Sequence, residues 1–191
     1  MNALHPLSVT ERTRVRRHSE RARTDRTELY DVLDAGMICH FAVVRDGSPV
    51  VLPTAYGRVG DTLYLHGSSA NRTLLAADGQ HVSVAVTHLD GLVCARAAFS
   101  HSVNYRSAVV FGVATLVRDD AERLTALRAV TQQLIPGRWE ALRSPPARSS
   151  PPPRCCPCRS RRRQSRSAPG RRPTNRTTSA PGCGRAWFPS R

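Results

Sequence analysis

The chain contains no lysine, and residues 144–191 contain neither a carboxylate nor a leucine, isoleucine or valine. All 29 basic residues are therefore arginines, and 12 of them lie in this last segment with 10 of the 14 prolines. A segment without large aliphatic side chains cannot bury enough apolar surface to offset the entropy lost on ordering. We predict that residues 144–191 form a disordered tail rich in Arg, Pro and Ser.

Residues 1–143 hold all 14 acidic residues against 17 arginines, so they carry only +3 of the chain's net charge of +15. This part has no run of ~18 apolar residues, which excludes a membrane-spanning helix. Its N-terminus lacks the apolar stretch of a secretory signal, which favours a cytoplasmic protein. Its only cysteines, Cys39 and Cys94, are isolated, so we expect small buried side chains rather than a disulfide or metal ligands.

One domain with a single core fits this length, preceded by a basic arm over residues 1–23. A helix is expected in "TDRTELYDVLDAG", capped by Thr24 or Asp25 and followed by Gly36 at its C-terminal end. The pattern then changes to period two. Three strands are expected, joined by turns at "RDGS" and "GRVGD": Ile38–Val44, Pro49–Tyr56 and Thr62–His66.

The second half alternates in a similar way. "NRTLLAADGQ" predicts a short helix ended by Gly79, two β runs flank a turn at "LDG", and a further strand has Gly112 at a bulge or close approach. "DDAERLTALRAVTQQLI" predicts an amphipathic helix with an apolar face made by Leu124, Leu127, Val130 and Leu134. Short strands with few helices indicate an α+β, mainly β fold, a small β-barrel rather than a doubly wound sheet.

Two clusters of polar residues stand out. In the first, "LPTAYG" precedes "LYLHGSSANR", where a Gly-Ser-Ser turn leads into a helix and Arg72 follows. Backbone N–H groups, hydroxyls and a guanidinium could converge there on a phosphate, although an ordinary turn has the same composition. In the second, "AFSHSVNYRSAVVFG" packs hydrogen-bonding side chains between two β runs. This favours a ligand-binding edge, or else a solvated loop with a buried tyrosine.

Together with "PGRWEALR", these stretches resemble the pyridoxamine 5′-phosphate oxidase-like family, in the flavin-nucleotide-binding branch related to nitroimidazole resistance. The similarity spans about residues 12–143. It implies an FMN-binding split β-barrel over residues 24–143, in a homodimer with FMN at the interface. The cofactor-binding residues implied are Pro53, Thr54, Ala55 and Tyr56 beside the isoalloxazine; His66, Gly67, Ser68, Ser69 and Arg72 at the phosphate; and Asn104, Tyr105, Arg106 and Ser107 from a neighbouring strand.

The predicted function is that of an FMN-binding flavoprotein, an oxidoreductase of a small organic molecule that resembles pyridoxamine 5′-phosphate oxidases or nitroreductases. A donor near flavin N1 stabilises the reduced anion, and Arg106 or His101 could supply it. No general acid or base is assigned, and His40 is as consistent with a core histidine as with a proton donor. The alternatives are a non-catalytic binder of flavin or another planar cofactor, and a nucleic-acid binder that uses the arginine-rich tail.

The tail admits four interpretations. A zinc site needs about four well-spaced ligands, but Cys155, Cys156 and Cys158 are crowded, Cys183 is remote and the tail has no histidine. Arginines attract phosphates of any sequence, but interleaved aromatic residues are lacking, so nucleic acid is not the expected partner. An ordinary solvated extension is the third interpretation.

We favour the fourth, that the tail is translated out of frame from GC-rich DNA, which the absence of lysine also fits. Permitted codons for Arg154 to Ser167, read in a shifted frame, give Leu-Leu-Pro-Val-Pro-Leu-Glu-Glu-Ala-Ser-Val-Lys-Val-Arg, similar to the last barrel segment of the family. This frameshift would leave the barrel without its last strand. For the chain as written we therefore expect weak folding, poor FMN retention or aggregation.

Overall fold

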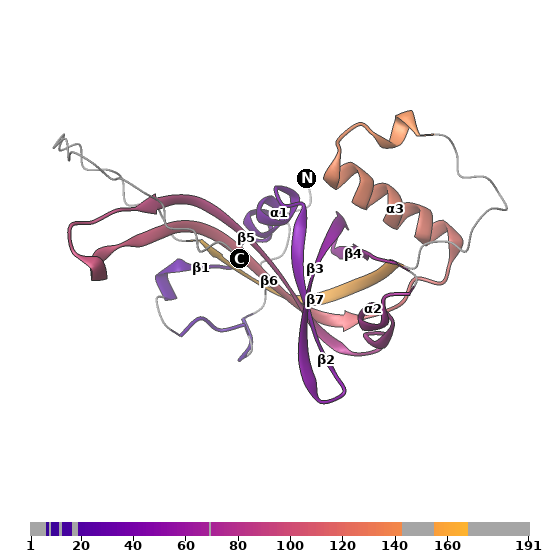
Figure 1. The fold of residues 1–191 in the computed structure, drawn as a ribbon, viewed down its shortest axis with the longest axis horizontal. Helices are drawn as coiled ribbons and strands as arrows, with labels where there is room; N and C mark the ends of the chain where they lie inside the picture. The colour runs from indigo at the N-terminus through magenta and orange to yellow at the C-terminus, as the bar shows by residue number, and fades with distance from the viewer. Residues whose placement is uncertain are drawn as a thin grey trace, which may run out of the picture.

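The computed structural model describes residues 7, 9–11, 13–16, 19–68 and 70–142, and residues 155–167 by their backbone alone. Its elements, in chain order (Figure 1), are η1 Ser19–Arg21, β1 Ala22–Arg23, α1 Arg26–Asp34, β2 Ile38–Arg45, β3 Ser48–Val59, β4 Thr62–His66, α2 Arg72–Ala76, β5 His81–Val93, η2 Ala98–Ser100, β6 Ser102–Ala114, α3 Asp120–Leu134, η3 Trp139–Ala141 and β7 Cys155–Ser167. None of the helices in these ranges is long and apolar enough to cross a membrane.

The strands form one antiparallel sheet in the order β1-β7-β4-β3-β2-β5-β6, and β7 pairs with β6 as well. This additional pairing closes strands β2 to β7 into a barrel. The short strand β1 pairs with the C-terminal end of β7. The predicted α+β, mainly β architecture is confirmed. The predicted bulge at Gly112 is also present, because the pairing of β6 with β7 shifts between Phe111 and Val113.

The tail differs from the expectation that the last strand is missing. The backbone of Cys155–Ser167 forms β7, which lies between β4 and β6. Without it each of these strands would present a row of unpaired N–H and C=O groups, which a backbone can satisfy whatever side chains it carries. The disorder expected for residues 144–154 and 168–191 concerns residues outside those described.

The core fills the barrel and is built from alternate residues of its strands. Phe41 on β2, Tyr56 on β3, Leu65 on β4 and Val84 on β5 are each at most 1% exposed. Helices α1 and α2 close the core with Leu29, Leu33 and Leu74. The N-terminal arm also contributes, since Leu7 belongs to this core cluster and its amide donates to the Thr24 carbonyl at 2.9 Å.

Helix α1 begins as predicted, with the Asp25 carboxylate accepting from the backbone N–H groups of Thr27 and Glu28. These bonds lower the pKa of Asp25. Gly36 follows the helix, but it does not adopt the left-handed conformation expected of a C-terminal glycine. Its role is steric, because a Cβ there would lie 2.5 Å from the Tyr56 hydroxyl and 2.8 Å from Val86 Cγ1.

Two expected turns lie inside strands. β3 continues through Gly57 to Val59, so the turn lies at Gly60, which has a φ of 55°, rather than over the whole of "GRVGD". β5 continues through "LDG" to Val93, and Asp90 is the extra residue of a bulge there. In both cases the pairing strand is long enough to extend the ladder past residues that favour turns.

Helix α3 packs against the outer side of β3 and β4, in a second cluster with Tyr64, Val117, Ala126 and Val130. Leu124, expected on the apolar face, is instead 45% exposed. At the far end of α3, the Gln133 amide nitrogen lies 2.7 Å from the carbonyl of Asp34 and 2.6 Å from that of Gly36. Helix α3 thereby satisfies carbonyls at the end of α1.

Candidate functional site

The first predicted cluster lies where β3 and β4 separate. β3 pairs with β2 from Ser48 to Ala55, but with β4 only from Tyr56 to Val59. Within the described residues, the second edge of Ser48–Ala55 therefore has no strand partner. Thr54 is the residue that links the separating strands, since its buried hydroxyl donates to the His66 carbonyl at 2.7 Å. The unpaired edge leaves backbone groups available to a ligand.

The turn after β4 leads into α2 as the sequence predicts. The Asn71 amide N–H donates to the Ser68 carbonyl at 2.9 Å, and the Ser68 hydroxyl accepts from the Ala70 N–H at 3.2 Å. The Asn71 side chain accepts from the N–H groups of Thr73 and Leu74, so it occupies two donors at the start of the helix. A phosphate here would thus depend on Arg72 and the turn rather than on the helix N-terminus. Ser69, also predicted here, lies outside the described residues.

Two arginines lie at the start of α2. Arg72 is exposed, and its side chain has no hydrogen bond or ion pair with any other described residue. Arg45, which sequence reasoning missed, donates from Nη1 to the Thr73 hydroxyl at 3.1 Å. No local signal could have revealed it, because Arg45 ends β2 and reaches α2 only through the fold. Arg45 also forms an ion pair with Asp46, with Nε 3.6 Å from Oδ2, so Arg72 is the better candidate of the two to bind an anion.

Asn71 offers a test of how far this turn depends on its cap. Asn71→Ala is expected to lower the free energy of unfolding by ~1 kcal/mol, because two helix N–H groups lose their acceptor. Asn71→Asp keeps an acceptor and serves as the control. Chemical denaturation of both variants measures the difference, and equal stabilities would show that the cap contributes nothing.

Tyr56 is one of the residues predicted beside the flavin ring, but its side chain is not available at the β3 edge. It is fully buried, its hydroxyl donates to the Leu33 carbonyl, and burial raises its pKa. Only its backbone can line a ligand. Pro53 is exposed, whereas Ala55 is partly buried and packs toward α3. His40 is exposed rather than part of the core.

The second predicted cluster, Asn104 to Ser107, lies within β6 and pairs with β5 from Thr87 to Gly91. Arg106 is held by Asp90, with Nε 3.0 Å from Oδ2 and Nη2 3.0 Å from Oδ1. Hydrogen bonding from Arg106 lowers the pKa of Asp90. The Arg106 charge therefore already has a carboxylate partner, which weakens the case for Arg106 as the donor near flavin N1. His101, the other candidate, accepts from the Ala95 N–H at 3.1 Å in the hairpin tip.

Beyond the bulge at Asp90, β5 and β6 continue as a two-stranded ribbon, which we call the arm: residues 89–105 (Figure 1). His88 fixes its base, donating from Nε2 to the Val32 carbonyl at 2.8 Å. The arm exposes large apolar side chains, with Leu92 72% and Phe99 fully exposed. Two-stranded ribbons are marginal alone in water, and exposed apolar side chains in a row indicate a contact surface.

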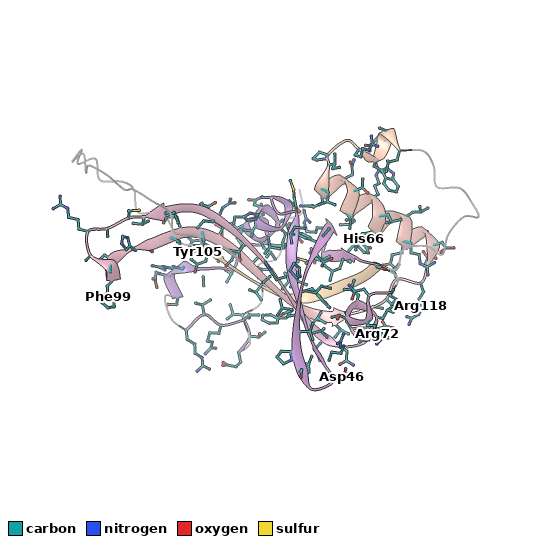
Figure 2. The ribbon with its side chains drawn as sticks, viewed as in Figure 1. Asp46, His66, Arg72, Phe99, Tyr105 and Arg118 are labelled. Atoms are coloured by element: carbon teal, nitrogen blue, oxygen red, sulfur yellow. The ribbon has the colours of Figure 1, made fainter. Side chains whose placement is uncertain are left out.

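The two clusters do not meet within one copy of the chain. In the sheet, β2 and β5 separate β3 from β6 on one side, and β4 and β7 separate them on the other. Figure 2 shows Tyr105 on the side of the arm, with His66 and Arg72 at the opposite end of the molecule. A ligand that contacts both clusters therefore needs residues from two copies.

Both cysteines of this part of the chain were expected to be buried. Cys39 is buried, but for Cys94 the expectation is wrong, because Cys94 is exposed near the arm tip. Burial raises the pKa of the Cys39 thiol to about 12, which makes it unreactive. Among the described residues no group of His, Cys, Asp and Glu side chains is placed to hold a metal ion.

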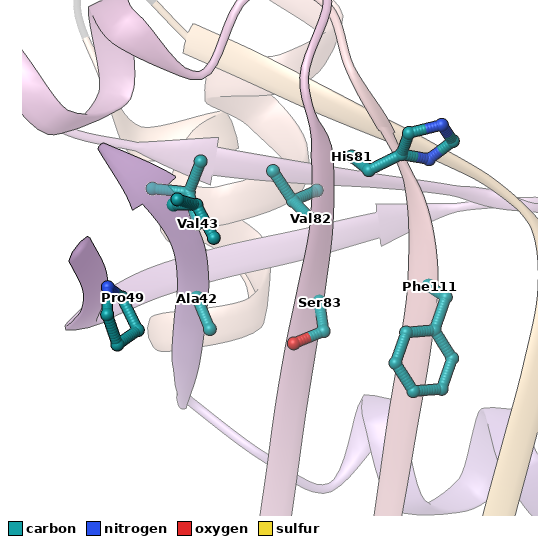
Figure 3. Close-up of a pocket in the computed structure, with 8 residues that line it drawn as sticks. Ala42, Val43, Pro49, His81, Val82, Ser83 and Phe111 are labelled. Carbon is teal, nitrogen blue, oxygen red and sulfur yellow. The ribbon is translucent and has the colours of Figure 1, made fainter. Parts of the chain in front are cut away.

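A shallow apolar groove lies on the outer face of the sheet (Figure 3). Its volume is about 360 Å³, and it is lined by Ala42, Val43, Val44, Pro49, His81, Val82, Ser83 and Phe111. None of the predicted cofactor-binding residues lies in it. The groove is therefore a surface distinct from both clusters.

The family model for pyridoxamine 5′-phosphate oxidase matches residues 25–153, more than half of the chain. The chain belongs to the pyridoxamine 5′-phosphate oxidase family. Its barrel is accordingly the split β-barrel of this family. No curated protein is significantly similar in sequence.

Two of the similar solved structures are more than a third identical to this protein in sequence. The flavocytochrome Anf3 from Azotobacter vinelandii is 35% identical, with a TM-score of 0.76 over 84% of this chain and 75% of that one. An FAD- and heme-binding protein from Mycobacterium smegmatis is 37% identical, with a TM-score of 0.73 over 78% and 74%. A structure described as a 5-nitroimidazole antibiotic resistance protein from Bacteroides thetaiotaomicron, 18% identical with a TM-score of 0.58 over 75% and 84%, shares the fold.

Proposed function

We propose that this protein binds a flavin between two copies of the chain and uses it in redox chemistry on a small organic molecule. Two observations carry the proposal: the edge of Ser48–Ala55 has no strand partner in the described part of the chain, and the Arg72 side chain has no partner there either. Strand backbone can hydrogen-bond the pyrimidine edge of the flavin ring, while Arg72 and the Ser68 turn take its phosphate. The resemblance assigns the same residues to the same parts of FMN.

The separation of the two clusters supports a homodimer. With the arm of one copy against the cradle of another, Asn104 to Ser107 would reach the flavin that Thr54 and Arg72 hold. A twofold arrangement forms two such sites and covers both arms. Gel filtration with light scattering tests the oligomeric state, and a monomer at micromolar concentration would contradict this arrangement.

The sequence predicts FMN, whereas the similar protein from Mycobacterium smegmatis is described as binding FAD. FMN and FAD share the ring, the ribityl chain and the first phosphate, which are the parts that the proposed residues contact. Acid release of the flavin, followed by chromatography against FMN and FAD standards, identifies the one retained. A colourless protein that gains no flavin spectrum on titration would contradict flavin binding itself.

Electron transfer through the flavin distinguishes an oxidoreductase from a protein that only binds flavin. We propose that the bound flavin, once reduced, passes electrons to a small organic acceptor. Anaerobic bleaching by a nicotinamide donor and reoxidation by the acceptor would support an oxidoreductase. A flavin that no donor reduces would favour the non-catalytic alternative.

Heme is a second candidate ligand, favoured by the similarity to a flavocytochrome and to an FAD- and heme-binding protein. A heme needs an axial ligand, most often histidine. His40 and His81 are exposed, and their imidazole rings form no hydrogen bond with other described residues. Expression with a heme precursor should then give a Soret band, and its absence after hemin titration would exclude heme.

Nucleic-acid binding was the other alternative, and it depends on a free arginine-rich tail. The backbone of Cys155–Ser167 lies in the sheet, so this part of the tail is not available as a flexible arm. We therefore do not propose it.

Arg72→Gln should weaken FMN binding about tenfold or more, because a charge-assisted hydrogen bond to the phosphate is lost. Fluorescence titration measures the dissociation constant. Riboflavin, which has no phosphate, should bind the variant and the parent equally well. Arg138→Gln is the matched control, because Arg138 is an exposed arginine just after the C-terminal end of α3 and belongs to neither cluster. An equal loss for riboflavin, or none for FMN, would remove Arg72 from the phosphate site.

A further inference from the structure

The strand that closes the barrel, β7, has a sequence that does not suit the positions it occupies. Residues directly opposite one another in an antiparallel ladder lie on the same face of the sheet. Cys156 is opposite Leu65 and Cys158 is opposite Leu63. Leu63 and Leu65 are buried in the barrel core, at 1% and 0% exposure. Positions 156 and 158 therefore belong to the core face.

The same argument applies on the other side of β7. Arg163 is opposite Val110 and Ser165 is opposite Ala108. Val110 and Ala108 are 1% and 0% exposed, so positions 163 and 165 also belong to the core face. The core face changes from even to odd numbers because the pairing is irregular between Phe111 and Val113.

Four core-facing positions thus carry Cys, Cys, Arg and Ser. A position on the core face favours an apolar residue because burying a charge is costly, so the position opposite Val110 does not suit an arginine. The strand has no aliphatic residue at all and five arginines among its 13 residues. It lacks the period-two alternation that specifies a strand with one buried face.

With the permitted codons given above, the shifted frame supplies the alternation that is missing. Each shifted codon takes most of its bases from the later of the two codons it spans, so its amino acid is assigned to that later position. Leu then falls at position 156, Val at 158, Ala at 163 and Val at 165. Glu, Ser and Lys fall at positions 162, 164 and 166, on the opposite face. Assignment to the earlier position would put Pro, Pro, Ser and Lys on the core face, so the match depends on this register.

We infer that the barrel is built to close with the shifted-frame segment, and that the tail of this chain is an out-of-frame product. The register of β7 was fixed by pairing with β4 and β6, independently of any codon argument. The inference does not depend on the proposed function.

The test compares two triple variants of the full chain, each taking its residues from the shifted frame. The core triple is Cys158→Val, Arg163→Ala and Ser165→Val. The matched control is Arg162→Glu, Gln164→Ser and Arg166→Lys, on the opposite face. The core triple should raise the melting temperature by about 10 °C over the parent and the control, because a position on the core face would no longer carry an arginine.

If the parent is recovered only as aggregate, the soluble fraction on expression replaces the melting temperature and should rise in the same order. A core triple no better than the control, or no better than the parent, would overturn the inference. Sequencing of the codons for Cys155 to Ala168 is a second test that does not depend on folding. A stop codon in the shifted frame, or the absence of the alternating apolar segment, would also overturn it.

Discussion

Gly57→Ala should lower the free energy of unfolding by ~3 kcal/mol or more, the upper end of the cost of overpacking. A Cβ at this position would lie 2.3 Å from the Ala129 carbonyl carbon and 2.5 Å from the Val130 nitrogen. Both are backbone atoms of α3, so no rotamer change can relieve the clash. Helix α3 would have to move away from β3, and Gln133 would lose its contact with the end of α1.

Gly91→Ala is the matched control. It is also a strand glycine, but its nearest atom would be Asn104 Nδ2 at 4.0 Å, so the added methyl group meets open space. Thermal unfolding of the two variants should differ by about 10 °C. Equal melting temperatures would show that α3 does not pack on β3 as closely as the structure places it.

Leu92→Asp should convert the dimer to a monomer and reduce flavin affinity about tenfold or more. Leu92 is 72% exposed in a single copy, so the substitution should leave the stability of the isolated barrel unchanged. Within a dimer contact, the carboxylate would be desolvated without a partner, which costs far more than the loss of one apolar contact. Flavin binding should fall with dimerisation because the arm would supply part of the site.

Light scattering and flavin titration, each over a range of protein concentrations, measure these two effects. Ile135→Asp is the control, because Ile135 is 58% exposed at the end of α3, away from the arm. A Leu92→Asp protein that remains dimeric and binds flavin like the parent would contradict the proposed role of the arm. Loss of both properties in the control would show a general effect of added charge.

Most of the fold could be predicted from the sequence because local patterns determine it. Hydrophobic periodicity marked every strand from β2 to β6, and Asp25, Asn71 and Asp119 cap the three helices. The errors lie where tertiary contacts override local preference. "LDG" favours a turn, yet the long pairing of β5 with β6 absorbs it as a bulge. Gly57 and Gly36 were assigned to turns and helix ends, but both are required by close packing.

The candidate site could be predicted only in part. The sequence indicated the Ser68 turn and Arg72 as candidates for binding a phosphate, since both lie within one short segment. It could not show that Asp90 pairs with Arg106 or that Arg45 reaches Thr73, because these contacts join residues far apart in the chain. Nor could it show that the two clusters lie at opposite ends of one copy. For the same reason, the position of Cys155–Ser167 in the sheet could be recognised only from its pairing with β4 and with β6.

The position of β7 has a consequence for synthesis. β4 is complete at His66, but the strand that covers its outer edge begins at Cys155. A ribosome makes ~5–20 residues per second, so nascent β4 waits for several seconds with that edge unpaired. The whole N-terminal part, including α3, is synthesised before a frameshift in the last strand can affect folding. A frameshift after residue 143 would therefore produce a nearly complete barrel with an unsuitable closing strand, rather than a chain that fails to fold early in its synthesis.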